Sequence, residues 1–260
     1  KFLHLSVEDY ELNGVKKQKE SIIFPRYHQM QVVRELSTDA KEKGAGQNYL
    51  IQHSAGSGKS NSIAWLSYRL SSLHNDSNER IFDSVVVITD RKVLDNQLQN
   101  TIYQFEHKQG VVQKIDENSQ QLADAISAGS NIIITTLQKF PFILEKIGAI
   151  PNRKYAVIID EAHSSQGGEA SKKMKEVLSA KTLEEAATEE SDSGLDEDAE
   201  DEMRKSMQAR GKQDNLSFFA FTATPKAKTV EVFGTKGIDG KPKPFHLYSM
   251  KQAIEEGFIL

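Results

Sequence analysis

The sequence predicts an α/β fold in which a mainly parallel sheet carries helices on both faces. Short apolar runs rich in β-branched residues recur along the chain. They do not alternate with polar residues, as expected for strands that are covered on both sides. Segments of helical period separate these runs, and strands that alternate with helices form right-handed βαβ units.

Five runs are expected to be the strands of this sheet. They are NYLIQ (48–52), SVVVIT (84–89), NIIITT (131–136), YAVIID (155–160) and SFFAFT (217–222).

Two of the intervening segments predict helices, over residues 60–75 and 90–105. Their apolar residues recur at helical spacing and would form one buried face on each helix. Trp65 is most simply explained as core packing. The two faces consist of Ile63, Leu66, Leu70 and Leu73 in the first helix, and of Val93, Leu94, Leu98 and Ile102 in the second.

The charge of the chain is unevenly distributed. Residues 184–202 hold 11 acidic residues and no basic one, although the net charge of the whole chain is only −4. Residues 181–215 contain too few apolar groups to offset the entropy of ordering, so we expect a disordered acidic insertion there. The remaining body is mildly basic, which is compatible with a polyanionic partner.

Composition excludes several classes of protein. The chain has no cysteine, so disulfides, thiolate metal sites and cysteine nucleophiles are ruled out. No apolar run approaches the roughly 20 residues that a membrane-spanning helix needs. We therefore expect a cytoplasmic protein without a membrane partner.

The stretch IQHSAGSGKSNSIAW (51–65) matches the phosphate-binding P-loop pattern G-x-x-x-x-G-K-[ST], with a strand before it and a helix after it. Lys59 would reach the β- and γ-phosphates of ATP, and the Ser60 hydroxyl would bind Mg²⁺. One position departs from the pattern, because His53 stands where the first glycine is expected. The expected cradle consists of Gly56, Ser57, Gly58, Lys59 and Ser60.

A second motif, AVIIDEAHSSQ (156–166), places two carboxylates at the end of a buried strand. Ligands of open α/β sheets bind at this end. Asp160 would hold Mg²⁺, directly or through water, and Glu161 would polarise the attacking water. Alternatively, the pair could be the acidic first turn of a helix.

Asp160 to His163 spell a DEAH box, and the chain resembles the first RecA-like motor domain of superfamily 2 helicases and translocases. FPRYHQMQVV (24–33) is similar to the adenine-side segment, which implies that Arg26 and Gln29 hydrogen-bond the base. FTATP (221–225) is similar to the Thr-Ala-Thr element. The resemblance implies that Thr222, Thr224 and His163 couple the nucleotide site to nucleic acid.

Two further segments resemble the elements of this family that touch the nucleic-acid backbone. ITDRKVLDNQL (88–98) would contribute Arg91, and ITTLQKF (134–140) would contribute Thr136, Gln138 and Lys139. For Arg91, Gln138 and Lys139, a role as solvated loop residues is equally open.

A narrower resemblance, from about residue 20 to the end, is to the motor (R) subunit of type I restriction-modification enzymes. It rests on the combination of the general motifs with VIIDEAHSSQGGE and IEEGFIL. It implies a lead-in over 1–20, a motor domain over 21–245 and the start of a linker to a second motor domain over 246–260. The partners would be double-stranded DNA and the methyltransferase and specificity subunits.

The expected function is that of one lobe of an ATP-dependent DNA translocase, whose parent also cleaves DNA. The opposite lobe of such motors supplies an arginine that accelerates hydrolysis about 10³–10⁵-fold, so the isolated lobe should be weakly active. The main alternative is a superfamily 2 motor without restriction activity, acting on DNA or RNA. A P-loop kinase and a pure binding module are further alternatives.

Overall fold

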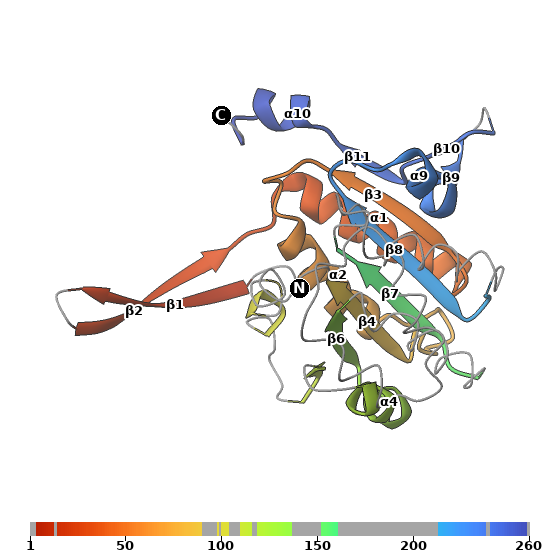
Figure 1. Ribbon diagram of the computed structural model, residues 1–260, viewed down its shortest axis with the longest axis horizontal. Helices are drawn as coiled ribbons and strands as arrows, with labels where there is room; N and C mark the ends of the chain where they lie inside the picture. Colours follow the sequence, from red (N-terminus) through yellow and green to blue (C-terminus); the bar gives the residue numbers. More distant parts are fainter. Residues whose placement is uncertain are drawn as a thin grey trace, which may run out of the picture.

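The computed structural model describes residues 4–12, 15–89, 98, 100–103, 110–115, 119–136, 152–160, 213–237 and 240–258. Its centre is a seven-stranded sheet in the order β11-β3-β8-β7-β4-β6-β5, in which every neighbouring pair is parallel (Figure 1). The strands are β3 (Asn48–His53), β4 (Ser84–Thr89), β5 (Val112–Lys114), β6 (Ile132–Thr136), β7 (Tyr155–Ile159), β8 (Leu216–Thr222) and β11 (His246–Tyr248).

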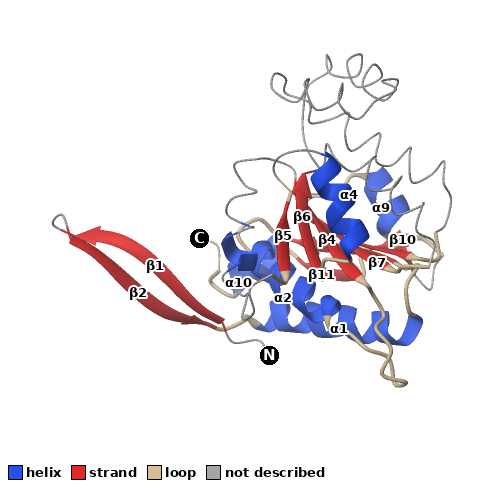
Figure 2. Cartoon of the chain, turned by 90° about the horizontal axis from the view of Figure 1, so that it is seen from below, coloured by secondary structure: helices blue, strands red, loops and turns tan. Residues whose placement is uncertain are grey.

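Helices cover both faces of the sheet, as the sequence predicts (Figure 2). On one face lie α1 (Tyr27–Lys43) and α2 (Lys59–Ser71), and on the other lie α4 (Ser119–Ala128) and α9 (Ala227–Phe233). A short helix, α10 (Met250–Glu255), follows β11. The predicted α/β class is therefore confirmed, and each of the five predicted strands is present to within one residue at either end.

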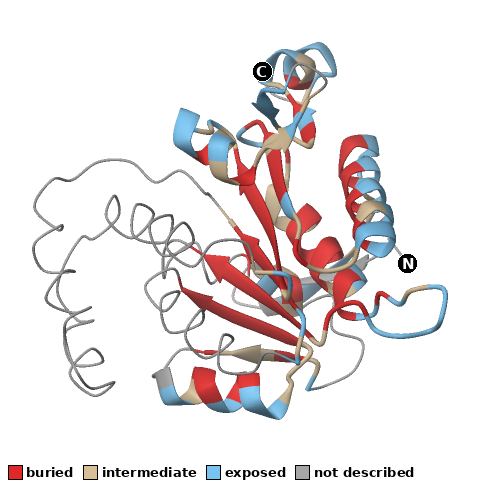
Figure 3. Cartoon of the chain, turned by 90° about the vertical axis from the view of Figure 1, so that its right-hand side faces the viewer, coloured by how far each residue is buried: buried red, intermediate tan, exposed pale blue. Residues whose placement is uncertain are grey.

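The core consists of two apolar layers, one on each side of the sheet (Figure 3). Successive side chains of a strand point to opposite faces. In β4, Val85 and Val87 pack on the side of α1 and α2, whereas Val86 and Ile88 pack on the side of α4. Because both faces are covered, a strand here needs apolar side chains on both sides of the sheet, which explains the unbroken apolar runs of the sequence.

The helix predicted over residues 60–75 ends earlier, at Ser71. The hydroxyls of Ser71 and Ser72 each donate to the Tyr68 carbonyl at 3.0 Å. Serine side chains that bond nearby carbonyls compete with helical backbone hydrogen bonds, which accounts for the early end. Leu73 still packs in the core, from beyond the end of the helix.

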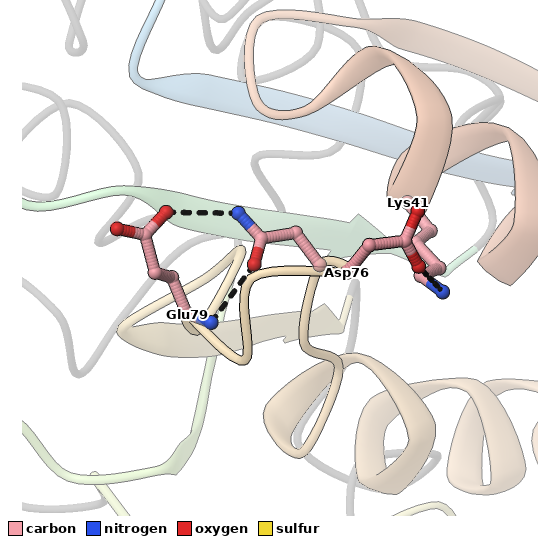
Figure 4. A network of polar contacts seen from close by, with 4 residues as sticks. Lys41, Asp76 and Glu79 are labelled. Atoms are coloured by element: carbon pink, nitrogen blue, oxygen red, sulfur yellow. Dashed lines mark hydrogen bonds and ion pairs between the residues drawn. The ribbon is translucent and has the colours of Figure 1, made fainter.

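The loop after α2 is held by polar contacts on the surface (Figure 4). The side chain of Asn75 donates to the Glu79 carboxylate at 2.9 Å and accepts from the Glu79 backbone N–H at 2.8 Å. The Lys41 ammonium contacts the Asp76 carboxylate at 2.5 Å. These contacts connect the loop to itself and to the end of α1.

Besides β5 and the helices α1, α4, α9 and α10, three further segments form elements that the sequence did not predict. Two strands near the start, β1 (His4–Leu12) and β2 (Val15–Ile23), form an antiparallel hairpin that projects from the sheet (Figures 1 and 2). A second hairpin consists of β9 (Thr235–Lys236) and β10 (Pro242–Lys243). The third, β11, pairs with β3, so the sheet includes residues from the segment 246–260 that was expected to begin a linker.

Two predictions fall largely outside the described residues. Of the helix predicted over 90–105, the structure describes residues 98 and 100–103, which are helical, with Leu98 and Ile102 buried in the core. Of the acidic insertion predicted over 181–215, only the last three residues are described.

Candidate functional site

The candidate site lies at the carboxyl edge of the sheet, where the parallel strands all end on the same side. Three neighbouring strands carry the main predicted residues: β3 is followed by the loop 54–58, β8 ends at Thr222, and β7 is followed by Asp160. Gln52 pairs with Thr222 across β3 and β8. Because adjacent strands lie about 4.8 Å apart, the ends of β3 and β7 are about 10 Å apart, with β8 between them.

The loop after β3 turns through two glycines with positive φ. Gly56 and Gly58 both have φ of 76°, and Gly58 is the N-cap of α2. The backbone angle at Gly58 favours glycine, and a Cβ there would lie 2.5 Å from Gln29 Nε2, so the Gln29 side chain would have to shift. The first N–H groups of α2 have no partner within the helix and carry partial positive charge. Lys59 and Ser60 occupy this first turn.

The start of α1 packs directly against this loop. Gln29 Nε2 donates to the Gly58 carbonyl at 2.9 Å and to the Ser57 carbonyl at 3.3 Å, and its Oε1 accepts from the Arg26 N–H at 2.8 Å. The Arg26 guanidinium lies 3.0 Å from the centre of the Phe258 ring, a cation–π contact. Contact of Arg26 and Gln29 with a base stays a prediction. The structure adds that Gln29 joins α1 to the loop.

Three buried histidines, which we call the histidine cluster, lie beside the loop: His28 in α1, His53 in β3 and His246 in β11. His28 Nε2 donates to the Ser57 carbonyl at 3.0 Å, and His53 Nε2 lies 2.9 Å from His246 Nδ1. The His28 ring stacks on Tyr248, with centroids 3.8 Å apart and planes 8° apart. One sign of this cluster is visible in the sequence, namely His53 in place of the first P-loop glycine.

Burial lowers the pKa of all three histidines in the cluster. It lowers the pKa of His53 to about 2, with smaller contributions in the same direction from His246, His28 and the Lys59 ammonium. Burial also lowers the pKa of His28 and of His246, although Glu256 opposes the shift at His28 and Glu35 opposes it at His246. Within the described ranges, no group of three or more histidine, aspartate or glutamate residues could hold a metal ion.

The other predicted residues divide into three groups. Asp160 is half-buried after β7, where its N–H donates to the Ile88 carbonyl at 2.9 Å, and Thr222 is buried at the end of β8. Thr224 is exposed two residues later, and Thr136 is buried at the end of β6, farther along the same edge. Outside the described residues lie Arg91, Gln138, Lys139, Glu161 and His163.

The residues at this edge fit a phosphate group and its magnesium ion. The Ser54 and Ser57 hydroxyls are buried and have no hydrogen-bond partner in the structure, so donors are available beside the helix terminus. An anion is stabilised by backbone N–H groups at a helix N-terminus that follows a glycine-containing turn. A hydroxyl at Ser60 and a carboxylate at Asp160 are the oxygen ligands that Mg²⁺ prefers. Among the described helices, none is long and apolar enough to cross a membrane.

Comparisons with solved structures found similar chains among ATPase and restriction-enzyme structures. The SWI2/SNF2 ATPase core of Sulfolobus solfataricus, solved with double-stranded DNA, is 16% identical with a TM-score of 0.44, covering 78% of this chain and 32% of that one. A fragment described as the HsdR subunit of a type I restriction enzyme from Vibrio vulnificus YJ016 is 17% identical with a TM-score of 0.47. That match covers 90% of this chain and 32% of the fragment. The nuclease-deletion mutant of the Type ISP restriction-modification enzyme LlaGI, solved with a DNA substrate mimic, is 14% identical with a TM-score of 0.50. That match covers 90% of this chain and 20% of the LlaGI chain.

At these identities the similarity concerns the fold alone, which is that of a RecA-like α/β domain. The chain spans about a third of the length of the first two structures and a fifth of the third. A comparison with curated proteins found no match. The family model of the SWI2/SNF2 ATPases matches residues 28–184, which is more than half of the chain and includes both the P-loop and the DEAH box. The chain therefore belongs to the SWI2/SNF2 ATPase family.

Proposed function

We propose that this chain is the first, ATP-binding lobe of a DNA translocase motor, and that its parent is the R subunit of a type I restriction enzyme. The observation that carries the proposal is the order of strand ends at the carboxyl edge. The P-loop, Thr222 and Asp160 follow the three neighbouring strands β3, β8 and β7. A nucleotide bound to the P-loop would therefore have a carboxylate about two strand spacings away.

Each residue of the site has a role in this proposal. Lys59 and the N–H groups of the P-loop would bind the phosphates, and Arg26 and Gln29 the adenine. Ser60 and Asp160 would hold Mg²⁺, which when bound neutralises charge on the phosphates. Glu161 would orient the attacking water.

Coupling to DNA would run along the same edge. Thr222 lies between the ends of β3 and β7, which suits a residue that senses both the P-loop and Asp160. With Thr224 and His163, it would connect the nucleotide to a DNA track formed by Arg91, Thr136, Gln138 and Lys139. Contacts would go mainly to phosphates, because a motor must move over any sequence, so binding should weaken steeply with salt.

The restriction assignment rests on the sequence resemblance to R subunits. It implies a motor domain over 21–245, a link to a second lobe from 246–260, and a parent that docks on methyltransferase and specificity subunits. The nuclease activity would reside in a domain outside this chain.

A second candidate is a SWI2/SNF2-type motor without restriction activity, which the family match over 28–184 favours. The two candidates differ in the parent protein. A nuclease domain encoded upstream in the same gene supports the restriction enzyme, and a full-length product without one supports the second candidate.

The direct test is a titration of ATP·Mg²⁺ against the wild-type chain and a Lys59→Ala variant, with and without duplex DNA. Loss of binding in the variant is expected, because Lys59 supplies the side-chain charge of the cradle. Equal binding by both proteins would remove the P-loop assignment. Brisk DNA-stimulated hydrolysis by the chain alone would contradict the need for a second lobe.

A further inference from the structure

Two side chains of α1, His28 and Gln29, donate hydrogen bonds to the phosphate-binding loop. His28 also contacts β11, because its ring stacks on Tyr248. We propose that His28 is a positioning residue for nucleotide binding: it fixes the backbone of the P-loop, and its stacking on Tyr248 makes the loop depend on the position of β11. This inference rests on the proposed function, because it assumes that the loop binds phosphate.

The hydrogen bond of His28 fixes which ring nitrogen carries its proton. The Ser57 carbonyl can only accept, so His28 Nε2 must donate across their 3.0 Å contact. The opposite nitrogen, Nδ1, is buried and has no hydrogen-bond partner. A neutral ring with its proton on Nε2 therefore satisfies the donor and leaves only a lone pair unpaired. His28 is thus held in one tautomer, with its N–H directed at the loop.

Anchoring these carbonyls orients the N–H groups that bind phosphate. The described peptide bonds are all trans, so the carbonyl of one residue and the N–H of the next point in opposite directions. His28 holds the Ser57 carbonyl toward α1, and Gln29 holds the Gly58 carbonyl the same way. The N–H groups of Gly58 and Lys59 must then point away from the donor side chains of α1. Without His28, the Ser57 carbonyl keeps only the longer contact with Gln29 Nε2, at 3.3 Å, so its peptide plane is held less firmly.

The other contacts of His28 lead to β11. Its ring lies flat on Tyr248, whose backbone carbonyl accepts from the Ser54 N–H at the start of the loop at 2.9 Å. The Tyr248 hydroxyl donates to Glu256 at 2.8 Å, and the Tyr27 hydroxyl donates to the other oxygen of the same carboxylate at 2.8 Å. The segment β11–α10 is therefore joined to both ends of the loop, at Ser54 directly and at Ser57 through the ring of His28.

The test compares the affinity for ADP·Mg²⁺, measured by calorimetry, in three variants of His28. His28→Gln keeps a donor at a similar distance, His28→Met has the same length as glutamine without a donor, and His28→Phe keeps a ring without a donor. We expect His28→Gln to bind ADP·Mg²⁺ within about 3-fold of the wild-type affinity. His28→Met and His28→Phe should bind about 10-fold more weakly, because each loses one hydrogen bond to the loop. His74→Phe is the matched control, because His74 also bonds a backbone carbonyl but is exposed in the loop after α2.

The link to β11 is tested with Tyr248→Leu, which removes the stacked ring. We expect weaker ADP·Mg²⁺ binding, and in combination with His28→Phe a loss smaller than the product of the two single effects, because both changes disrupt one support. Independent effects, or equal affinities of the glutamine and methionine variants, would overturn the proposal. The proposal would also be overturned if circular dichroism showed that His28→Met and His28→Phe do not fold, since His28 would then be needed for core packing.

Lys59→Ala separates this inference from the proposed function. If wild type binds and Lys59→Ala does not, the cradle is established, and the His28 series then decides the inference on its own. If wild type and Lys59→Ala bind equally, both the proposed function and the inference are wrong.

Discussion

Lowering the pH from 7.5 to 5.5 should destabilise the folded chain through the histidine cluster. The pKa of His53 is lowered to about 2 by burial, whereas a histidine in the unfolded chain has a pKa of about 6.5. Below pH 6.5 the unfolded state therefore binds a proton that the folded state does not. Stability is fully present above pH 6.5 and falls as the pH drops from there toward the folded pKa.

The magnitude follows from this difference in proton binding. For a group that stays neutral when folded, the two pH units cost about 1.4 kcal/mol, about three quarters of it below pH 6.5. His53 alone should contribute that amount. Burial also lowers the pKa of His28 and of His246, so both add to the loss of stability at low pH. The nearby carboxylates of Glu256 and Glu35 oppose these pKa shifts and make the added loss smaller.

Urea unfolding at pH 7.5, 6.5 and 5.5 measures the effect, with the wild type compared with His53→Gln. The variant cannot take up the proton, so its stability should fall by about 1.4 kcal/mol less over this range. His74→Gln is the control, and it should fall as steeply as wild type because His74 is exposed. Equal slopes in wild type and His53→Gln, or no loss of stability at pH 5.5, would refute the reasoning.

Four substitutions elsewhere have distinct expected outcomes. Gly58→Ala places a methyl group 2.5 Å from Gln29 Nε2 at a φ of 76°, so it should weaken nucleotide binding and also destabilise the fold. Gly44→Ala, at a φ of 73° with no atom within 4 Å, should cost only the backbone strain of about 1–2 kcal/mol and leave binding unchanged. Phe219→Ala empties a fully buried site between α1 and the sheet and should cost about 3–5 kcal/mol in urea unfolding. Asp76→Asn removes an exposed ion pair (Figure 4) and should leave the thermal midpoint unchanged, because such pairs are screened by solvent.

The central strands could be predicted because burial on both faces constrains every residue in them. SVVVIT over 84–89 is apolar on both sides of the sheet, so its strand was predicted with the bounds that β4 has. The strand β11 carries no such signal, since three residues are too few to show a pattern and its place depends on pairing with β3. The end of α2 was missed because it depends on serine hydroxyls that bond nearby carbonyls.

The candidate site was predictable where its residues are contiguous. The P-loop lies in one stretch of sequence, and Asp160 directly follows an apolar run. The histidine cluster is different, because His28, His53 and His246 come together only when α1, β3 and β11 are packed. His53 alone carried a local signal, as a departure from the glycine pattern. No spacing rule could have indicated that His28 supports the P-loop.

The strand that carries the P-loop has both of its neighbours far later in the sequence. Asn48 pairs with Phe218 and Ile51 pairs with His246, so β3 cannot be flanked until the residues of β8 and β11 have left the ribosome. Contacts of such long sequence separation slow folding, because the intervening chain must first be closed into a loop. Until then β3 exposes two unpaired edges, which favour aggregation. The half of the sheet around the P-loop should therefore be the last to assemble during synthesis.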